Sequence, residues 1–195
     1  MNQINKVCVY CASSTKIAPK YFEVATRLGE LIGKKKLTLL NGGGKFGLMA
    51  ATTDAVIENG GVAIGIIPQF MIDHGWDYDK MSQMIVVDGM HERKQMMADK
   101  SDAVIALPGG CGTWDELIEI ITWKQLGLYQ GPIVILNQDG YYDPLLAMFD
   151  RALEENFMGV RHADLWNVAT TAEEAMDMIY TIPLWDKSYT KFAAI

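Results

Sequence analysis

The sequence lacks the features with which proteins enter membranes or bind nucleic acids. In its 195 residues no apolar run approaches the ~20 residues that span a bilayer. The first residues, MNQINKVCVY, have neither the basic start nor the long apolar segment of a signal peptide. The formal net charge is −7, which argues against a nucleic-acid backbone as the main partner. We therefore expect a cytoplasmic protein with no membrane and no nucleic-acid partner.

Cysteine is also scarce, with only Cys8, Cys11 and Cys111 in the chain. An odd count without an export signal favours reduced thiols. Cys8 and Cys11 have C-x-x-C spacing, but Cys8 falls inside an apolar run that predicts a strand, and there is no second pair. We therefore expect no metal site, and we interpret Cys111 as a small loop residue rather than a nucleophile.

The composition and the hydrophobic pattern instead predict a folded α/β domain. Half of the residues are hydrophobic, and the length suits one domain with a sizeable core. Short apolar runs alternate with segments of helical period, which is typical of a doubly wound parallel sheet. We expect a single domain over residues 1–183 and an aromatic tail over 184–195. The expected strands are 4–10, 36–41, 62–68, 84–88, 102–108, 132–137 and a short edge strand at 166–169.

The stretch PGGCGTWDE, Pro108 to Glu116, joins a predicted strand to a predicted helix. Its glycines, Gly109, Gly110 and Gly112, remove the β-carbons that would keep an anion away from the backbone. We expect Thr113 to cap the helix, with Glu116 in the capping-box position. The first N–H groups of such a helix bind phosphate well. The alternative interpretation is a plain tight turn before a capped helix.

A second glycine motif, NGGGKFGLM, places Gly42, Gly44 and Gly47 in the pattern G-x-G-x-x-G. A dinucleotide site needs an acidic residue at the end of the next strand. That strand ends in Pro68 and Gln69 instead, so we do not expect NAD. Two interpretations remain open: close packing of a helix on a strand, or a second wall of a nucleotide pocket.

Two cations, Arg93 and Lys94, lie near the start of the helix predicted from MHERKQMMADKS. Cations there oppose the helix dipole, so an anionic substrate would explain their position, whereas a solvated surface pair is the alternative. In a doubly wound sheet the ligand binds at the carboxyl ends of the strands. Ser13, Gly43 and Gly109 are expected at the same edge, and we therefore assign them to the same substrate-binding site.

The connection over residues 69–83 is long and irregular in sequence, and such loops are usually functional. It contains Phe70, Trp76 and Tyr78, so we expect it to form a pocket lid or to contact a base. Its single histidine, His74, is interpreted as a surface residue. The twelve methionines are interpreted as core or interface residues, because most recur at helical spacing.

Taken together, GGGKFGLM, MHERK and PGGCGTWDE resemble the signatures of the Lonely-guy (LOG) family, and the resemblance runs from Val7 to about Phe157. Members are cytokinin riboside 5′-monophosphate phosphoribohydrolases, often mislabelled as lysine decarboxylases. The resemblance implies a Rossmann-like homodimer without metal or organic cofactor. It also implies hydrolysis of the N-glycosidic bond of nucleoside 5′-monophosphates such as AMP, which releases the free base and ribose 5-phosphate.

The resemblance also assigns site residues by matching positions. Arg93 and Glu116 would be the catalytic pair, and Thr122 matches a substrate-contacting threonine. The phosphoribose site would be lined by Lys94, Gly110, Cys111, Gly112, Thr113, Trp114 and Asp115. One position departs from the family, because members often carry a Lys-Glu pair in the loop after the third strand. Here the glutamate position is Gly75.

The chemistry gives Glu116 a role beside the resemblance. Cleavage of an N-glycosidic bond builds positive charge on the sugar, which a carboxylate beneath the ring stabilises. We expect Glu116 in the first helical turn, where the helix dipole favours the ionised form. A capping role alone is the alternative for this residue. A non-catalytic nucleotide sensor would use the same glycine loop, and a lysine decarboxylase would need a pyridoxal phosphate lysine, for which the sequence offers no context.

Overall fold

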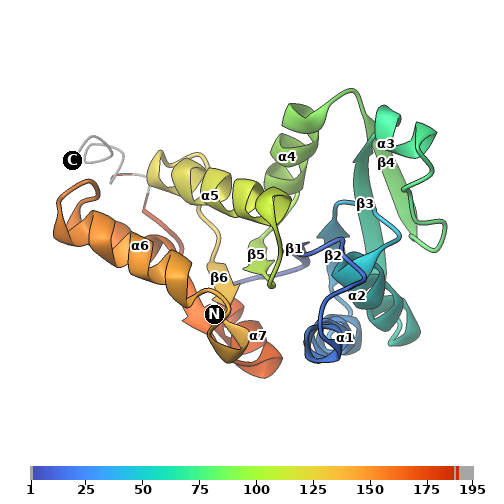
Figure 1. The fold of residues 1–195 in the computed structure, drawn as a ribbon, viewed down its shortest axis with the longest axis horizontal. Helices are drawn as coiled ribbons and strands as arrows, with labels where there is room; N and C mark the ends of the chain where they lie inside the picture. The colour runs from blue at the N-terminus through green and yellow to red at the C-terminus, as the bar shows by residue number, and fades with distance from the viewer. Residues whose placement is uncertain (1, 187, 189–195) are drawn as a thin grey trace.

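The computed structural model describes residues 2–186 and 188, and these form one parallel sheet with helices on both faces (Figure 1). The seven strands lie in the order β4-β3-β2-β1-β5-β6-β7. This confirms the predicted doubly wound α/β fold, and each strand lies within two residues of its predicted bounds. The strands are β1 (Lys6–Tyr10), β2 (Thr38–Asn41), β3 (Val62–Pro68), β4 (Gln83–Val87), β5 (Ala103–Ala106), β6 (Ile133–Leu136) and β7 (Asn167–Ala169).

Alternating side chains of the strands supply two cores, one on each face of the sheet. In β1, Val7 and Val9 point into the first core, whereas Cys8 and Tyr10 point into the second. Helices α1, α2 and α7 cover the first face, and α4, α5 and α6 cover the second (Figure 1). The helices are α1 (Pro19–Lys34), α2 (Gly47–Glu58), α3 (Gln69–Asp73), α4 (Met90–Asp99), α5 (Cys111–Gln125), α6 (Asp143–Glu154) and α7 (Ala172–Thr181), with 3₁₀ turns η1 (Gln138–Gly140) and η2 (Val160–Leu165).

The order of the strands reverses between β1 and β5, which are paired neighbours. From β1 the chain moves outward to β4, and it then returns to β5 on the other side of β1. The loops that follow β1 and β5 therefore lead in opposite directions and leave a crevice at the carboxyl ends of these strands. This is the edge of the sheet at which the sequence predicted the site.

The segment 69–83 begins with more order than its sequence suggested. The short helix α3 follows Pro68 directly, and its end is marked by Gly75 with a φ of 67°. No residue of α3 is buried, which explains why it has no hydrophobic period to detect. At the other end of the chain, Thr171 is the N-cap of α7 and accepts a hydrogen bond from the Glu174 N–H at 3.1 Å.

Part of the predicted tail lies against the domain rather than away from it. Trp185 is buried in the second core, and its backbone N–H donates to the Gln130 carbonyl at 2.9 Å. The rest of the predicted tail, residues 187 and 189–195, lies outside the described residues. Among the helices that the structure describes, none combines the length and apolar character needed to cross a bilayer.

Candidate active site

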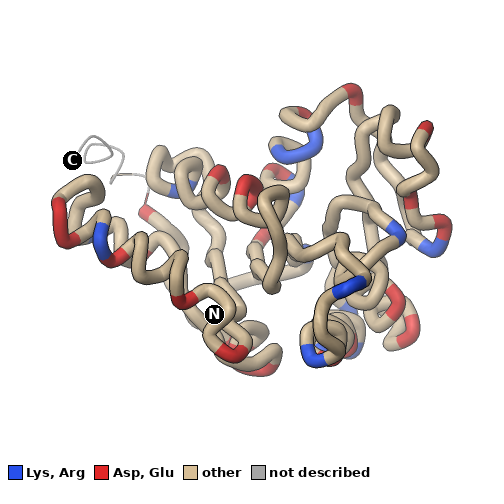
Figure 2. The backbone as a smooth tube through the Cα atoms, viewed as in Figure 1, with Lys and Arg blue, Asp and Glu red and all other residues tan. Residues whose placement is uncertain are grey.

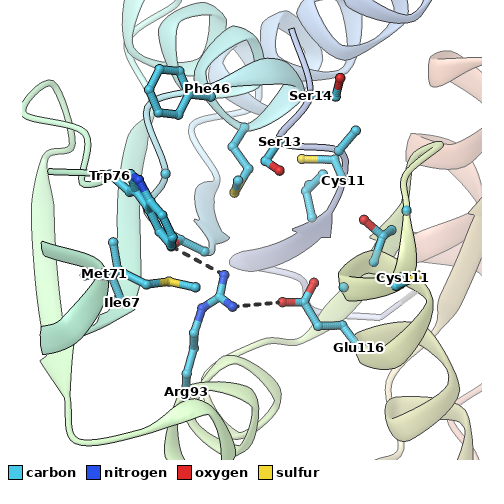
Figure 3. A pocket seen from close by; sticks show the side chains of 18 of the residues that line it. Cys11, Ser13, Ser14, Phe46, Ile67, Met71, Trp76, Arg93, Cys111 and Glu116 are labelled. Carbon is cyan, nitrogen blue, oxygen red and sulfur yellow. Dashed lines mark hydrogen bonds and ion pairs between the residues drawn. The ribbon is translucent and has the colours of Figure 1, made fainter. Parts of the chain in front are cut away.

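A cavity of about 520 Å³ occupies the crevice beyond β1 and β5 (Figure 3). Its walls come from segments far apart in the sequence, within residues 9–14, 42–49, 67–76, 90–93 and 110–116. The volume is in the range of pockets that hold small organic ligands. The topology of the sheet therefore brings the predicted motifs together around one space.

Many of the predicted site residues line this cavity, and others lie next to it. Those in its wall are Ser13, Arg93, Gly110, Cys111, Gly112, Thr113 and Glu116. Those outside the wall are Gly43, Lys94, Gly109, Trp114, Asp115 and Thr122. The neighbouring Ser14 lies in the wall as well.

Helix α5 begins earlier than the sequence predicted, at Cys111, so the proposed cap at Thr113 is wrong. Gly110 holds the N-cap position, and Thr113 is a buried residue of the first helical turn. The flexible glycines allow the chain to enter the helix before it reaches a capping side chain. No side-chain cap is present at this helix start in the described chain. Its first N–H groups are consequently left for a ligand.

The three glycines of this loop are not required for the same structural reason. A β-carbon on Gly109 would lie 2.1 Å from the Thr113 hydroxyl oxygen, so this glycine is required by packing. A β-carbon on Gly110 or Gly112 would meet nothing within 4 Å. Both of these glycines line the cavity. The open backbone at these two positions supports the expectation that the loop makes room for an anion.

The side chains of Arg93 and Glu116 point toward each other from α4 and α5 (Figure 3). The guanidinium Nη1 lies 3.4 Å from the carboxylate Oε1, and the two side chains are only 8% and 11% exposed. Arg93 also donates from Nε to the Ile66 carbonyl at 3.0 Å. The Arg93 side chain is therefore buried and fixed by these two interactions, and its interpretation as a solvated surface cation is wrong.

The second glycine motif both lines the cavity and allows a helix to pack closely on a neighbouring loop. Gly42 and Gly44 line the cavity, and a β-carbon on Gly42 would lie 1.8 Å from Nη2 of Arg93. Gly47, with a φ of 63°, allows α2 to pack closely on the loop after β1, since a β-carbon there would lie 2.6 Å from the Ala12 carbonyl. Gly42 thus makes the space in which the guanidinium of Arg93 lies.

Burial controls the protonation of Glu116. Burial raises the pKa of the Glu116 carboxyl to about 7, although the nearby Arg93 charge lowers it. The predicted stabilisation of the ionised form by the helix start is therefore wrong, because Glu116 lies in the second turn of α5 and loss of solvent outweighs that effect. A carboxyl group that titrates near neutral pH can both stabilise positive charge and exchange protons.

A second ion-pair cluster joins the same two helices just outside the cavity. Lys94 Nζ lies 3.0 Å from Asp115 Oδ2 and 3.1 Å from Glu119 Oε1. Figure 2 shows positive charge on α4 and negative charge on the neighbouring α5. Lys94 and Asp115 therefore form an ion pair with each other. Thr122 lies further along α5, and its hydroxyl donates to the Ile118 carbonyl at 2.8 Å.

One wall of the cavity is apolar, and the sequence indicated it only in part. Trp76 lines the cavity, as expected of a lid or base contact, whereas Phe70 and Tyr78 do not. The other large apolar side chains of this wall are Phe46, Met49, Ile67, Met71 and Met90. The sequence did not assign the methionines to the cavity, because residues on a helix recur with the same period whether they face a cavity or a buried core.

The Trp76 segment is fixed to the second glycine loop by backbone hydrogen bonds. The Lys45 N–H donates to the Trp76 carbonyl at 3.0 Å, and the Tyr78 N–H donates to the Gly43 carbonyl at 2.9 Å. Gly43 is thus a backbone anchor for this segment. The exposed His74 ring lies 4.9 Å from the Trp76 indole, between ring centroids, and supports it from outside.

The cysteines are free thiols in different surroundings. Cys8 and Cys11 are buried, and burial raises the pKa of both thiols well above its ordinary value. Cys111 is exposed at the start of α5. Within residues 2–186 and 188, no three His, Cys, Asp or Glu side chains group as a metal ion would need.

Comparison with known proteins places the chain in a protein family. A protein-family model described as "Possible lysine decarboxylase" matches residues 49–179. The chain is 39% identical over 178 residues to "Cytokinin riboside 5'-monophosphate phosphoribohydrolase LOG5" of Arabidopsis thaliana, covering 91% of this chain and 78% of that protein. It is also 39% identical over 173 residues to "Cytokinin riboside 5'-monophosphate phosphoribohydrolase LOG" of Oryza sativa subsp. japonica, covering 89% and 72%.

Solved structures share the fold. The molybdenum cofactor carrier protein of Chlamydomonas reinhardtii matches with a TM-score of 0.70 and 23% identity, covering 92% of this chain and 98% of that one. At this identity the match shows the fold alone. The relatives at 39% identity carry the argument further, and they confirm the resemblance that the three sequence motifs indicated. The chain therefore belongs to the LOG family of cytokinin riboside 5′-monophosphate phosphoribohydrolases.

Proposed function

We propose that this protein hydrolyses the N-glycosidic bond of nucleoside 5′-monophosphates, either cytokinin nucleotides or AMP itself. The observation that carries the proposal is the buried pair of Arg93 and Glu116, which shares one cavity with the open start of α5. A phosphate needs N–H donors, and a developing sugar cation needs a carboxylate. The cavity offers both within one small space.

In this proposal the phosphate binds the backbone N–H groups of Gly110, Cys111 and Gly112. The ribose then lies over the first turns of α5, with its C1′ atom toward Glu116. As the bond from C1′ to the base breaks, positive charge develops on the sugar and the carboxylate of Glu116 stabilises it. The oxygen of a water molecule bonds to C1′, and the departing base takes up a proton. Arg93 orients Glu116 through their ion pair.

The remaining predicted residues support this site from its edge. We propose that Lys94 and Asp115 hold α4 and α5 together beside the catalytic pair through their 3.0 Å ion pair. Gly109 allows Thr113 to pack beneath the loop. Ser13 lines the cavity. Trp114 and Thr122 would contact substrate from the exposed side of α5.

We further propose that the protein is a cytoplasmic homodimer. The family resemblance implies the dimer, and free cysteines suit a reducing compartment. Exposed apolar side chains on α6, on α5 and directly after α5, among them Met148, Ile118 and Leu126, supply surface for such a contact.

Two other functions are less well supported. A non-catalytic nucleotide sensor is not favoured, because relatives at 39% identity over most of the chain are named phosphoribohydrolases. A lysine decarboxylase would form a Schiff base between a lysine and pyridoxal phosphate. No lysine lines the cavity in the part of the chain that the structure describes, so the family description gains no support from the site.

The proposed activity can be tested directly with purified protein. Incubation with AMP and with isopentenyladenosine 5′-monophosphate, followed by chromatography, should yield free base and ribose 5-phosphate in equal amounts. Intact nucleotide together with measurable binding would indicate a sensor instead. Comparison of the two rates would show which base the apolar wall prefers.

A further inference from the structure

Two tyrosines behind the glycine loop donate hydrogen bonds to its backbone. Tyr141 and Tyr142 belong to the DGYYDP turn that leads from β6 into α6, and neither lines the cavity. The Tyr141 hydroxyl donates to the Gly109 carbonyl at 2.7 Å. The Tyr142 hydroxyl donates to the Leu107 carbonyl, also at 2.7 Å. The turn therefore contacts the end of β5 and the loop that precedes α5.

The hydrogen bond to Gly109 fixes the direction of the next N–H group. In a planar trans peptide, the C=O of one residue and the N–H of the next point in opposite directions. Because Tyr141 holds the Gly109 carbonyl on the far side of the loop, the Gly110 N–H is directed to the near side. Gly110 lines the cavity there. The Tyr141 hydroxyl thus sets the orientation of an amide that faces the proposed phosphate site.

The tyrosines are themselves held in place. The Tyr142 N–H donates to the Asn137 side-chain oxygen at 2.7 Å, and the Asn137 amide donates to Asp143 at 2.7 Å. The ring of Tyr141 lies edge-on to Tyr142 and to Tyr21, with centroids 5.1 Å and 5.9 Å apart. Burial raises the pKa of both hydroxyl groups above the ordinary value, so both remain donors at neutral pH.

We propose that Tyr141 is a positioning residue that presets the phosphate-binding amides of the loop through the Gly109 carbonyl. Tyr142 acts one step earlier, by anchoring the end of β5 at Leu107. This inference rests on the proposed function, because it assumes that a phosphate binds the loop. It gives a role to the DGYYDP motif, which lies outside the cavity wall.

The test is the variant Tyr141→Phe, which keeps the ring packing and removes the hydroxyl group. We expect binding of ribose 5-phosphate, measured by calorimetry, to weaken by about five-fold, in line with the loss of one hydrogen bond. The KM for AMP should rise to a similar degree with kcat little changed, and binding of free adenine should be unaffected. Tyr21→Phe is the matched control, because it removes a hydroxyl from the neighbouring ring and should change neither ligand.

Equal affinity for ribose 5-phosphate in wild type and Tyr141→Phe would overturn the inference. Parallel loss of ribose 5-phosphate and adenine binding would also overturn it, because general damage to the fold affects both ligands. Wild-type protein that binds ribose 5-phosphate without cleaving AMP would contradict the proposed function, while the comparison of the two tyrosine variants would still decide the role of Tyr141. Wild-type protein that does not bind ribose 5-phosphate would contradict both.

Discussion

Arg93 and Glu116 lie 3.4 Å apart, Nη1 to Oε1, with about nine-tenths of each side chain removed from solvent. A buried ion pair of this kind seldom gains much stability, because desolvation of both charges offsets their attraction. The pair also has no short hydrogen bond within it, while the arginine is held by the carbonyls of Ile66 and Gly42. We interpret this arrangement as one that keeps an arginine in place beside a carboxyl group whose charge is adjustable.

The position of Arg93 depends on Gly42, and this can be tested with one methyl group. In Gly42→Ala the added β-carbon would lie 1.8 Å from Nη2, so the guanidinium must leave its present position beside Glu116. We expect kcat to fall by about 10²-fold, the typical cost of misplacing a catalytic group, with circular dichroism unchanged. Gly89→Ala is the control, since a β-carbon there meets nothing within 4 Å and activity should persist. Full activity in both variants would show that Arg93 is not needed where it lies.

The pH dependence of catalysis should report Glu116. Because burial raises its pKa to about 7, the required carboxylate is lost as pH falls through neutrality, and kcat/KM should decline on the acid side. Asp115 also raises this pKa, so Asp115→Asn should move the acid limb to lower pH. Asp139→Asn is the control, because Asp139 forms an exposed ion pair with Lys20 and does not act on the pKa of Glu116. This variant should leave the pH profile unchanged. A profile that is flat from pH 5 to 8 would argue against a titrating Glu116.

Trp76 should act on the base and not on the sugar phosphate. It forms part of the apolar wall, and stacking of a base on an aromatic ring is worth about 1–3 kcal/mol. We expect Trp76→Ala to weaken adenine binding by about ten-fold while ribose 5-phosphate binding is retained. Phe70→Ala is a close control, because Phe70 is as exposed as Trp76, at 43%, but lies outside the cavity wall. Similar losses in the two variants would remove Trp76 from base recognition.

The surroundings of Lys124 lead to a prediction about stability and not about activity. It is 1% exposed on α5, and its Nζ has no hydrogen-bond partner among the described residues. Burial lowers its pKa from 10.5 to about 8, and the charge of Asp164 offsets this only in part. We therefore expect Lys124→Met to raise the free energy of unfolding by about 2 kcal/mol at pH 7, because it removes an unpaired buried charge.

The same lysine sets the sign of a pH effect. Between pH 8 and 10.5 the unfolded chain binds more protons at Lys124 than the folded protein does, so wild-type stability rises relative to that of Lys124→Met. Urea titrations of both proteins at pH 7, 8, 9 and 10 measure the difference, which should shrink as pH rises. The same change at exposed Lys16 should have little effect at any pH. A difference between wild type and Lys124→Met that does not depend on pH would contradict the buried charge.

The sequence predicted the sheet and the loops of the site because both leave local signals. Apolar runs indicated the strands, and glycines marked both loops that line the cavity. The start of α5 was predicted too late, because Thr113 is a good capping residue and the glycines that allow an earlier start leave no capping signal. Bounds of this kind depend on how the loop packs, as the contact between Gly109 and Thr113 shows.

The environment of the side chains was harder to predict than their location. The raised pKa of Glu116 comes from burial between α4 and α5, which are brought together by the tertiary fold. From the local sequence only the effect of the helix dipole could be inferred, and that effect lowers the pKa instead of raising it. In the same way, Met49 and Met71 look like core residues until the fold places them in the cavity wall.

The role of Glu116 is tested most directly by the rate of base release from AMP by wild-type protein and by Glu116→Gln, with ribose 5-phosphate measured as the second product. Glutamine preserves the shape of the side chain but can neither carry the negative charge nor exchange the proton. We expect a folded variant that still binds ribose 5-phosphate and whose kcat is about 10³-fold lower, in line with the loss of one electrostatic catalytic group. Comparable turnover in the two proteins would contradict the claim that Glu116 stabilises the sugar as the base departs.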